Sequence, residues 1–322
     1  MRPITFLCNN IEMDLCSDME NIAASLLIKQ GYNEKDVALL SDPLKTLFEH
    51  NMLNISISKR RIVYSNEFRC PSKCKKALDF ITKKIERGED INPFLSKRQD
   101  RADAKDELLF DWGIYHLHLV DTYDGIGRSK RSNYLLFFRC DDSTMYFIQI
   151  YKHNPAPFAK GELQRIVIHN WPHLLAPVAP IEASLTEPIT DDVRKVLRKK
   201  HGMSFFELDG KLYFPPGGGY MSDGSSFFVV RHADYCWDSV KLFEKRLLLN
   251  ISAIRKAIDE LIYPDIAKDD LKFKLLQVNL TKLIVCEMSN LIKIEYEIQS
   301  HICRVESFLY PEKEAVYLYL SE

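Results

Sequence analysis

The chain has 322 residues, of which 46% are hydrophobic and 28% are charged, and this balance is typical of a globular protein rather than a disordered one. Its 44 basic and 45 acidic residues leave a formal net charge of −1, so any attraction to nucleic acid must come from local patches. No window approaches the roughly eighteen consecutive apolar residues of a membrane span. Asn9, Asn10 and Glu12 interrupt the apolar run that a signal peptide needs. We therefore expect a cytoplasmic protein with no membrane partner.

The eight cysteines are dispersed, and only Cys70 and Cys74 lie close together in the sequence. A zinc site would need a second such pair, or a pair of histidines, at the usual spacing, and none follows. Disulfides are not expected in a reducing cytosol. We interpret Cys70 and Cys74 as small residues at the start of a helix, and we expect neither a metal nor a cofactor.

The N-terminal part of the chain shows mainly helical patterns. Between residues 16 and 50 apolar residues recur at intervals of three and four, and Gly31 favours an end to the first helix. Pro43 follows Ser41 and Asp42, which are good capping residues, and it suits the first turn of the second helix. The segments that follow are a strand pair over 53–64, an amphipathic helix over 74–88 and a highly charged linker over 92–106. The sequence thus predicts a mainly helical N-terminal region over 1–92.

The central part changes to strand patterns that are rich in aromatic and β-branched residues. Short polar connections separate three such runs, which predicts an antiparallel meander. The three runs are 112–120, 133–140 and 145–152. A helix over 160–170 follows, and Pro172 should end or bend it. We expect a domain over 107–176, followed by a proline-rich linker over 176–190.

The C-terminal part, 190–322, reads as a further α+β domain. Its expected elements are a short basic helix over 191–202, two strands around a glycine-rich loop within 211–232, a long amphipathic helix over 234–262 and alternating strands over 271–320. The predicted fold class is α+β, with an N-terminal mainly helical region, a central antiparallel meander plus helix, and a C-terminal antiparallel sheet with a long helix.

Histidines are concentrated in the central region, which holds five of the nine. Because side chains alternate along a strand, His116 and His118 should point to the same face, with the leucines beside them on the other. His153 ends a neighbouring strand and comes near that pair if the strands form a meander. These three histidines are therefore the main candidates for chemistry.

Two other segments are weighed as possible ligand-binding sites. Gly217–Gly219 would allow a backbone to approach a phosphate, but the segment lacks the lysine and the following helix of a P-loop. A flexible hairpin tip is the favoured interpretation. Arg194, Arg198 and His201 share one face of the short basic helix, for which a solvated basic face is favoured.

The order of elements in the central region resembles a known family. Gly113, Ile114 and Tyr115 begin a strand, Arg131 precedes the run Tyr134–Phe137, an acidic turn follows, and Tyr146–Lys152 leads to a helix. Over residues 111–171 this order resembles the core of RelE-like toxins, the endoribonucleases of toxin–antitoxin systems. The family commonly has Leu-Arg where this chain has Leu117 and His118, and its members are much shorter than this chain.

The resemblance implies a toxin-like or antiphage-defence effector. Its substrate would be RNA, free or bound to the ribosome, and its partner an antitoxin or another defence protein. The implied fold over 111–171 is the meander followed by a helix, as the strand patterns predict independently.

Metal-free RNA cleavage needs a base for the ribose 2′-OH, an acid for the leaving 5′-oxygen and a cation for the phosphorane. Histidine suits the first two roles because its pKa lies near neutrality. We expect His116 or His118 to act as the base and His153 as the acid. The candidate phosphate-binding residues are Arg131, Lys152 and Lys130, while Tyr115, Tyr151 and Trp112 could stack on bases.

Two alternatives remain open from the sequence. The same histidines, with His153 or Asp121, could begin the metal site of a divalent-metal phosphodiesterase or nuclease. In the other alternative the histidines are structural, and the protein binds nucleic acid or a partner protein without catalysis.

Overall fold

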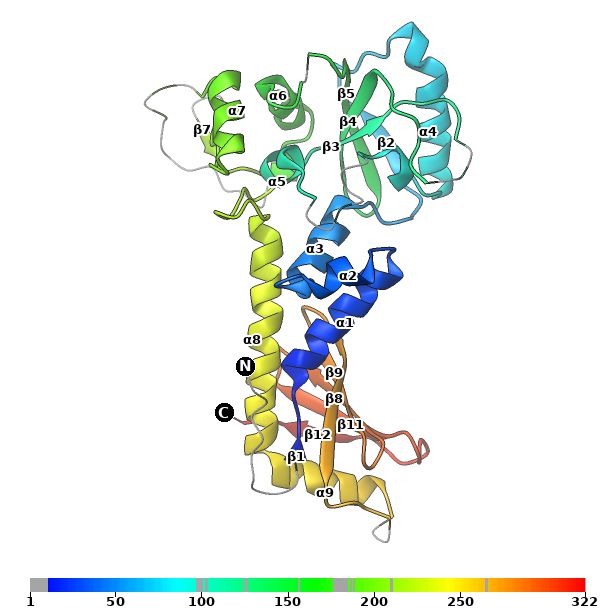
Figure 1. Ribbon diagram of the computed structural model, residues 1–322, viewed down its shortest axis with the longest axis vertical. Helices are drawn as coiled ribbons and strands as arrows, with labels where there is room; N and C mark the ends of the chain where they lie inside the picture. Colours follow the sequence, from blue (N-terminus) through cyan, green and yellow to red (C-terminus); the bar gives the residue numbers. More distant parts are fainter. Residues whose placement is uncertain are drawn as a thin grey trace. The chain divides into compact units, whose positions relative to one another are not determined.

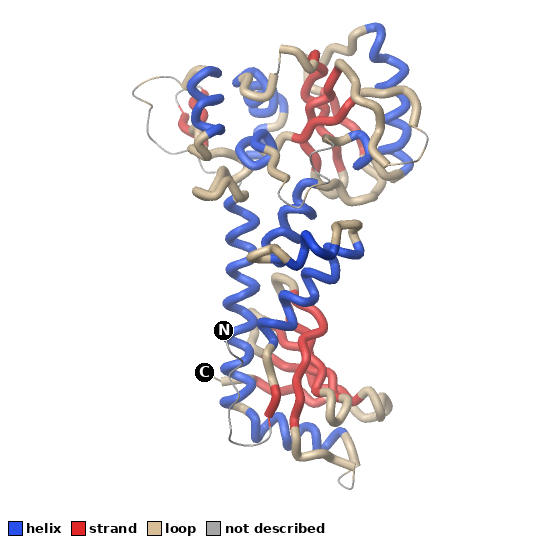
Figure 2. The backbone as a smooth tube through the Cα atoms, in the orientation of Figure 1, coloured by secondary structure: helices blue, strands red, loops and turns tan. Residues whose placement is uncertain are grey.

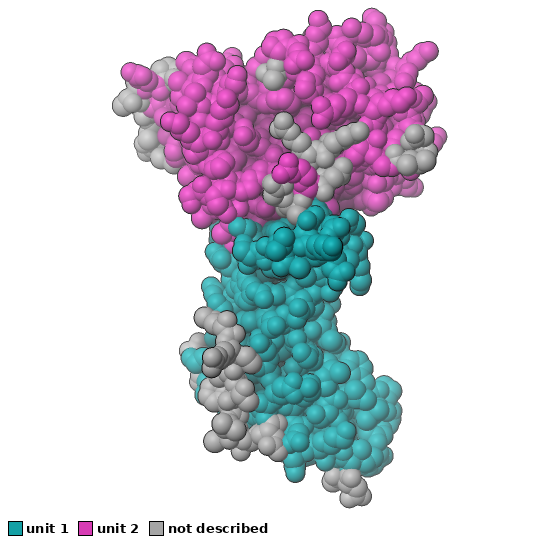
Figure 3. Space-filling view, viewed as in Figure 1, with its two compact units in different colours: residues 1–48, 231–322 teal, residues 49–230 magenta. Residues whose placement is uncertain are grey.

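The structure of the chain is a computed structural model that describes residues 11–96, 101, 104–123, 125, 127–155, 157–175, 185, 187, 189–208, 211–263 and 266–321. It divides into two compact units, which Figure 3 colours separately. Unit 1 consists of Met1–Phe48 and Arg231–Glu322, and unit 2 of Glu49–Val230. Unit 1 is thus built from both ends of the chain. The domain boundaries expected at 92–107 and 176–190 both fall inside unit 2.

The helices of unit 1 begin with α1, Leu15–Lys29, whose N-cap Asp14 accepts a hydrogen bond from the backbone of Ser17. The others are α2 (Glu34–Ala38), the start of α3 (Pro43–Leu53), most of α8 (Phe227–Leu249) and α9 (Ile251–Leu261). The helical prediction for 16–50 is confirmed. The prediction of a single helix over 234–262 is wrong, because Asn250 separates two helices, α8 and α9. The side-chain amide of Asn250 donates to the carbonyl of Arg246. The strand expected near 227–232 is also wrong, since those residues form the first turns of α8.

The sheet of unit 1 has the strand order β1-β8-β9-β10-β11-β12. Its strands are β1 (Ile11–Glu12), β8 (Leu271–Val278), β9 (Lys282–Glu287), β10 (Ile292–Glu297), β11 (Ile302–Ser307) and β12 (Val316–Tyr319). The pairs from β8 to β12 are antiparallel, which confirms the C-terminal antiparallel sheet, and β1 adds in parallel to β8. Residues of α1, α8 and α9 share one hydrophobic core with this sheet. Figure 2 shows the strands of this sheet in red.

The main sheet of unit 2 has the order β2-β5-β4-β3. Its strands are β2 (Arg61–Tyr64), β3 (Tyr115–His118), β4 (Tyr134–Cys140) and β5 (Thr144–Lys152). The pairs β3·β4 and β4·β5 are antiparallel, so the predicted meander is confirmed, while β2 runs parallel to β5. The strand pair expected over 53–64 is wrong, since only Arg61–Tyr64 forms a strand there.

The first strand of the meander starts later than the sequence predicts. Glu107–Trp112 forms a helix, α5, in place of the strand expected from residue 112. Asp106 caps it by accepting from the backbone N–H groups of Leu108 and Leu109. Gly113, with φ of 65°, ends it in the left-handed conformation that glycine adopts without steric cost.

Helices cover both faces of this sheet (Figure 1). On one face Leu136 and Phe138 pack against α4, Lys75–Arg87. On the other, Leu135 and Phe137 pack against α6, Gly161–Asn170. Short 3-10 turns occur at Ser72–Cys74, Asn92–Phe94 and Pro172–Leu175. A sheet buried on both sides offers its side chains to solvent only at its edges and strand ends.

The remaining elements of unit 2 are α7 (Asp191–Lys199) and the hairpin of β6 (Phe206–Leu208) and β7 (Lys211–Tyr213). The glycine-rich loop after β7 is buried, which corrects the expectation of a flexible hairpin tip. The Gly217 amide donates to the carbonyl of Asp111 at 2.9 Å, and that of Gly219 to the carbonyl of Phe110 at 2.9 Å. A Cβ on Gly217 would lie 2.3 Å from the carbonyl oxygen of Leu109, so glycine allows the loop to cap the end of α5.

Within the described parts of the chain, no helix combines the length and apolar character required to cross a bilayer.

Gly217→Ala should destabilise unit 2 by about 1–3 kcal/mol, because the added methyl group overlaps backbone atoms of α5. Urea unfolding followed by the fluorescence of Trp112 and Trp171, in a Trp237→Phe background, measures this unit alone. Gly125→Ala is the matched control, since a Cβ there meets nothing within 4 Å. Its positive φ should cost only about 1 kcal/mol. Equal losses for the two variants would contradict the packing argument.

Candidate functional site

His116 and His118 project from the same face of β3, toward α6. In the β3·β4 register His116 lies opposite Phe137 and His118 opposite Leu135, and both partners belong to the core beneath α6. Leu117 packs in the core on the α4 side. The alternation expected from the sequence is therefore present, but the histidine face is a covered face of the sheet.

The structure brings the three candidate histidines together. The rings of His118 and His153 are stacked, with centroids 5.9 Å apart and planes 17° apart. The backbone N–H of His153, just after β5, donates to the carbonyl of Asn133 at 2.8 Å. The Phe158 ring forms T-shaped contacts with the rings of His116, at a centroid distance of 5.0 Å, and His153, at 6.2 Å.

His118 is oriented by the backbone of Ser132. Its Nδ1 lies 3.2 Å from both the amide nitrogen and the carbonyl oxygen of that residue. When Nδ1 carries the proton it donates to the carbonyl, and Nε2 is then free to accept a proton. In the other neutral tautomer Nδ1 accepts from the Ser132 N–H instead.

His116 has a carboxylate partner that the sequence did not single out. Its Nδ1 lies 3.6 Å from Oδ2 of Asp106, and both side chains are 12% exposed. Asp106 fell in the segment interpreted as a linker. The available signal was its position directly before the apolar run of α5, where an aspartate is a preferred N-cap.

Burial lowers the pKa of His116, and a charge on His153 lowers it further, while Asp106 opposes the shift. Burial also lowers the pKa of His118, and positive charges on His116, His153 and Arg131 act in the same direction. The backbone of Ser132 partly opposes that shift. Both imidazoles are therefore neutral near pH 7, which is the state a general base requires.

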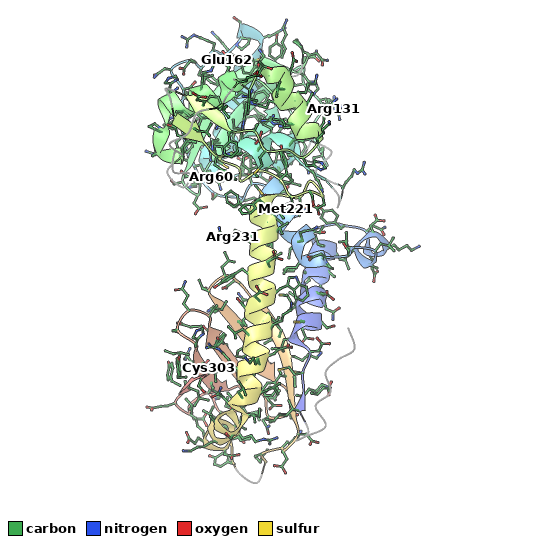
Figure 4. All side chains as sticks on the ribbon, turned by 90° about the vertical axis from the view of Figure 1, so that its left-hand side faces the viewer. Arg60, Arg131, Glu162, Met221, Arg231 and Cys303 are labelled. Atoms are coloured by element: carbon green, nitrogen blue, oxygen red, sulfur yellow. The ribbon has the colours of Figure 1, made fainter. Side chains whose placement is uncertain are left out.

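The three candidate phosphate-binding cations, Arg131, Lys152 and Lys130, are all exposed. Arg131 lies at the surface of unit 2 (Figure 4) and is close enough to His118 to influence its pKa. Lys152 is the last residue of β5, directly before His153. Lys130 lines a separate surface hollow of about 250 Å³. Among the described residues no contact joins Lys130 or Lys152 to the histidine rings.

A buried ion pair lies close to the histidine cluster. Arg198 Nε donates to Asp111 Oδ2 at 2.8 Å, and the Ser204 hydroxyl donates to the same oxygen at 3.0 Å. The guanidinium of Arg198 also lies over the Trp112 ring, 4.4 Å from its centroid, and donates to the carbonyl of Phe158. Asp111 and Trp112 are fully buried.

This arrangement corrects two expectations from the sequence. Arg194 and Arg198 are 3% and 2% exposed, so α7 does not present them as a solvated basic face. Trp112 stacks with these arginines and is closed to a nucleic-acid base. Tyr115 is also held, since its hydroxyl donates to the carbonyl of Met52 and its ring stacks on Phe138.

The described residues contain no group of three or more His, Cys, Asp or Glu side chains arranged to hold a metal ion. No family model, curated protein or solved structure matches the chain. The proposals that follow rest on the geometry of the chain itself.

The stability of unit 2 should fall as the pH is lowered from about 7 to about 5. The folded-state pKa values of His116 and His118 are lowered, so below about pH 6.5 the unfolded chain binds more protons than the folded one. The contribution of these two histidines to the free energy of unfolding is complete above that pH and is lost as the pH falls. The free energy of unfolding, measured against pH by Trp fluorescence, should show this slope.

The double variant His116→Gln/His118→Gln should flatten this pH dependence. His169→Gln, at an exposed position on α6, is the matched control and should leave the slope unchanged. A double variant with the wild-type slope would show that these two histidines do not cause it.

Proposed function

We propose that unit 2 cleaves RNA by metal-free acid–base catalysis, with His118 and His153 as the reacting pair. The supporting observation is the stacking of these two rings at 5.9 Å. Two imidazoles this close disfavour a double positive charge, because each imidazolium would repel the other. One neutral and one protonated imidazole is the combination that transesterification of a phosphodiester requires.

His118 is assigned as the base because burial keeps it neutral and because the Ser132 carbonyl can hold the proton on Nδ1. His153 is only half-buried and is assigned as the acid. His116 is enclosed by Phe137, Phe158 and Asp106, and we assign it a positioning role. Its contact with Phe158 links it to the ring that also touches His153.

The exposed cations supply the phosphate contacts in this proposal. Arg131 is electrostatically coupled to His118, and Lys152 adjoins His153 in the chain, so both lie at the end of the meander where the pair is found. Lys130 extends the positive charge along the neighbouring loop. The biological setting would be that of a cytoplasmic toxin or antiphage effector acting on free or ribosome-bound RNA, controlled by an antitoxin or another defence protein.

A non-enzymatic binding protein with structural histidines is the second candidate. The observation that favours it is the enclosure of His116 by two phenylalanine rings, which is typical of a core residue. In that case substitutions of the cluster would change stability without changing any RNA-cleaving activity.

His118→Ala and His153→Ala should each lower the rate constant of RNA cleavage by about 10²–10⁴-fold, because each removes one proton-transfer group. The measurement is single-turnover cleavage of a labelled RNA by the purified full-length chain, with circular dichroism to confirm folding.

His169→Ala is the matched control for these variants, because it removes an exposed histidine from α6 of the same unit. Its rate should equal that of the wild type. Folded His118→Ala and His153→Ala variants that cleave at the wild-type rate would exclude the assigned roles.

Arg131→Gln should move the acidic limb of the pH–rate profile to higher pH. The limb reports protonation of His118, whose pKa is lowered by burial and by the charge of Arg131, so removing that charge raises it. Lys76→Gln, the same loss of charge on exposed α4, should leave the limb in place. A raised KM with an unmoved limb would mean that Arg131 binds substrate without tuning His118.

A further inference from the structure

The N-terminus of α6 already holds an anionic group. The backbone N–H of Gly161, the first residue of the helix, donates to Asp191 Oδ1 at 2.9 Å. Arg194 Nη1 donates to the same oxygen at 2.9 Å. The Asp191 side chain is 59% exposed, so this carboxylate sits at the surface while the groups that hold it are buried. A helix N-terminus with an added guanidinium is a favourable place for an anion.

The guanidinium at this position is unusually well fixed. Arg194 has a side chain only 4% exposed, and it lies over the Trp112 ring at 5.0 Å from the centroid. It also donates to the carbonyls of Ala159, at 3.3 Å, and Ile189, at 3.2 Å. A Cβ on Gly161 would lie 3.3 Å from Arg194 Nη1, so the glycine allows this close approach.

An independent observation comes from Gln164, one turn further along α6. It is fully buried, and neither its amide oxygen nor its amide nitrogen has a hydrogen-bond partner among the described residues. Residues three apart share a helix face, and the Cα–Cβ bonds of a helix tilt toward its N-terminus, so Gln164 lies on the face of α6 that also carries Gly161. A buried amide is costly to leave unbonded, which points to a polar ligand at this end of the helix.

The site is linked to the histidine cluster through the segment that leads into α6. The ring of Phe158 contacts His116 and His153, and three residues later the chain reaches Gly161. Lys160 is the N-cap of α6, and its Nζ lies 4.9 Å from the centroid of the Tyr151 ring. Tyr151 on β5, its partner on β4 and His118 on β3 lie side by side across the sheet. Figure 1 shows α5, α6 and α7 gathered on this side of the sheet.

We propose that the N-terminus of α6, with Arg194, Lys160 and Gln164, binds a phosphate group of the RNA substrate, next to the one that is cleaved. Asp191 occupies the site in the free protein and swings into solvent when the phosphate binds. The choice of RNA as the carrier of the phosphate rests on the proposed function, whereas the phosphate site itself does not.

The test compares Asp191→Asn with Asp192→Asn. The two changes remove the same charge from adjacent residues in the first turn of α7, but only Asp191 contacts Gly161 and Arg194. Isothermal titration measures the binding of inorganic phosphate and of a short single-stranded RNA, in a His118→Ala background that prevents cleavage. Asp191→Asn should bind both about tenfold more tightly, since a charged competitor is removed, and Asp192→Asn should match its parent.

Gly161→Ala should weaken binding of both ligands, because its methyl group crowds Arg194. Equal affinities for the Asp191→Asn and Asp192→Asn variants would overturn the site. A gain for inorganic phosphate without a gain for RNA would overturn the assignment of RNA as its ligand. If RNA cleavage is absent from the wild type while Asp191→Asn still tightens binding, the proposed function fails and the phosphate site stands.

Discussion

The arrangement of unit 2 around its candidate site depends on the buried contact between Trp112 and two arginines. Removing guanidinium groups from water is costly unless each charge has a partner. Here Asp111 pairs with Arg198, and the guanidinium groups of both arginines lie over the indole ring of Trp112. The contact joins α5 to α7. Through the carbonyl of Phe158 it also fixes the segment before α6. Two of the side chains that contact His116 come from these parts of the chain, namely Phe158 from the segment before α6 and Asp106 from the N-cap of α5.

Enclosure determines the protonation of the histidines. A histidine on an exposed strand would titrate close to its ordinary pKa, whereas burial disfavours the imidazolium form of His116 and His118. Asp106 limits this effect for His116, since its carboxylate favours the charged ring. His153, at the end of β5, is more open to solvent. The cluster thus contains imidazoles in different environments, which is how proteins separate an acid from a base.

Local periodicity was sufficient to predict the meander and the shared face of His116 and His118, because both depend on the two-residue repeat of a strand. The failures share another cause. The segment 227–232 has strand propensity but forms the start of α8, where packing overrides local preference. Arg198 looked solvated because its partner Asp111 lies 87 positions away in the chain. Gly217 looked like a flexible tip because Asp111, at the end of α5 that it covers, lies 106 positions earlier in the chain.

The discontinuous composition of unit 1 has a consequence for synthesis of the protein. Its core combines Leu15 and Met19 of α1 with Phe273 and Leu275 of β8. The core can therefore form only after β8 has left the ribosome. Unit 2 is continuous from Glu49 to Val230, and all of its residues are translated before β8 exists. Since domains tend to fold as units while the chain is being made, the unit that carries the histidine cluster is completed first. A message truncated after residue 230 would then yield that unit without its companion, and any control exerted through unit 1 would arrive only after the strands from β8 onward have been made.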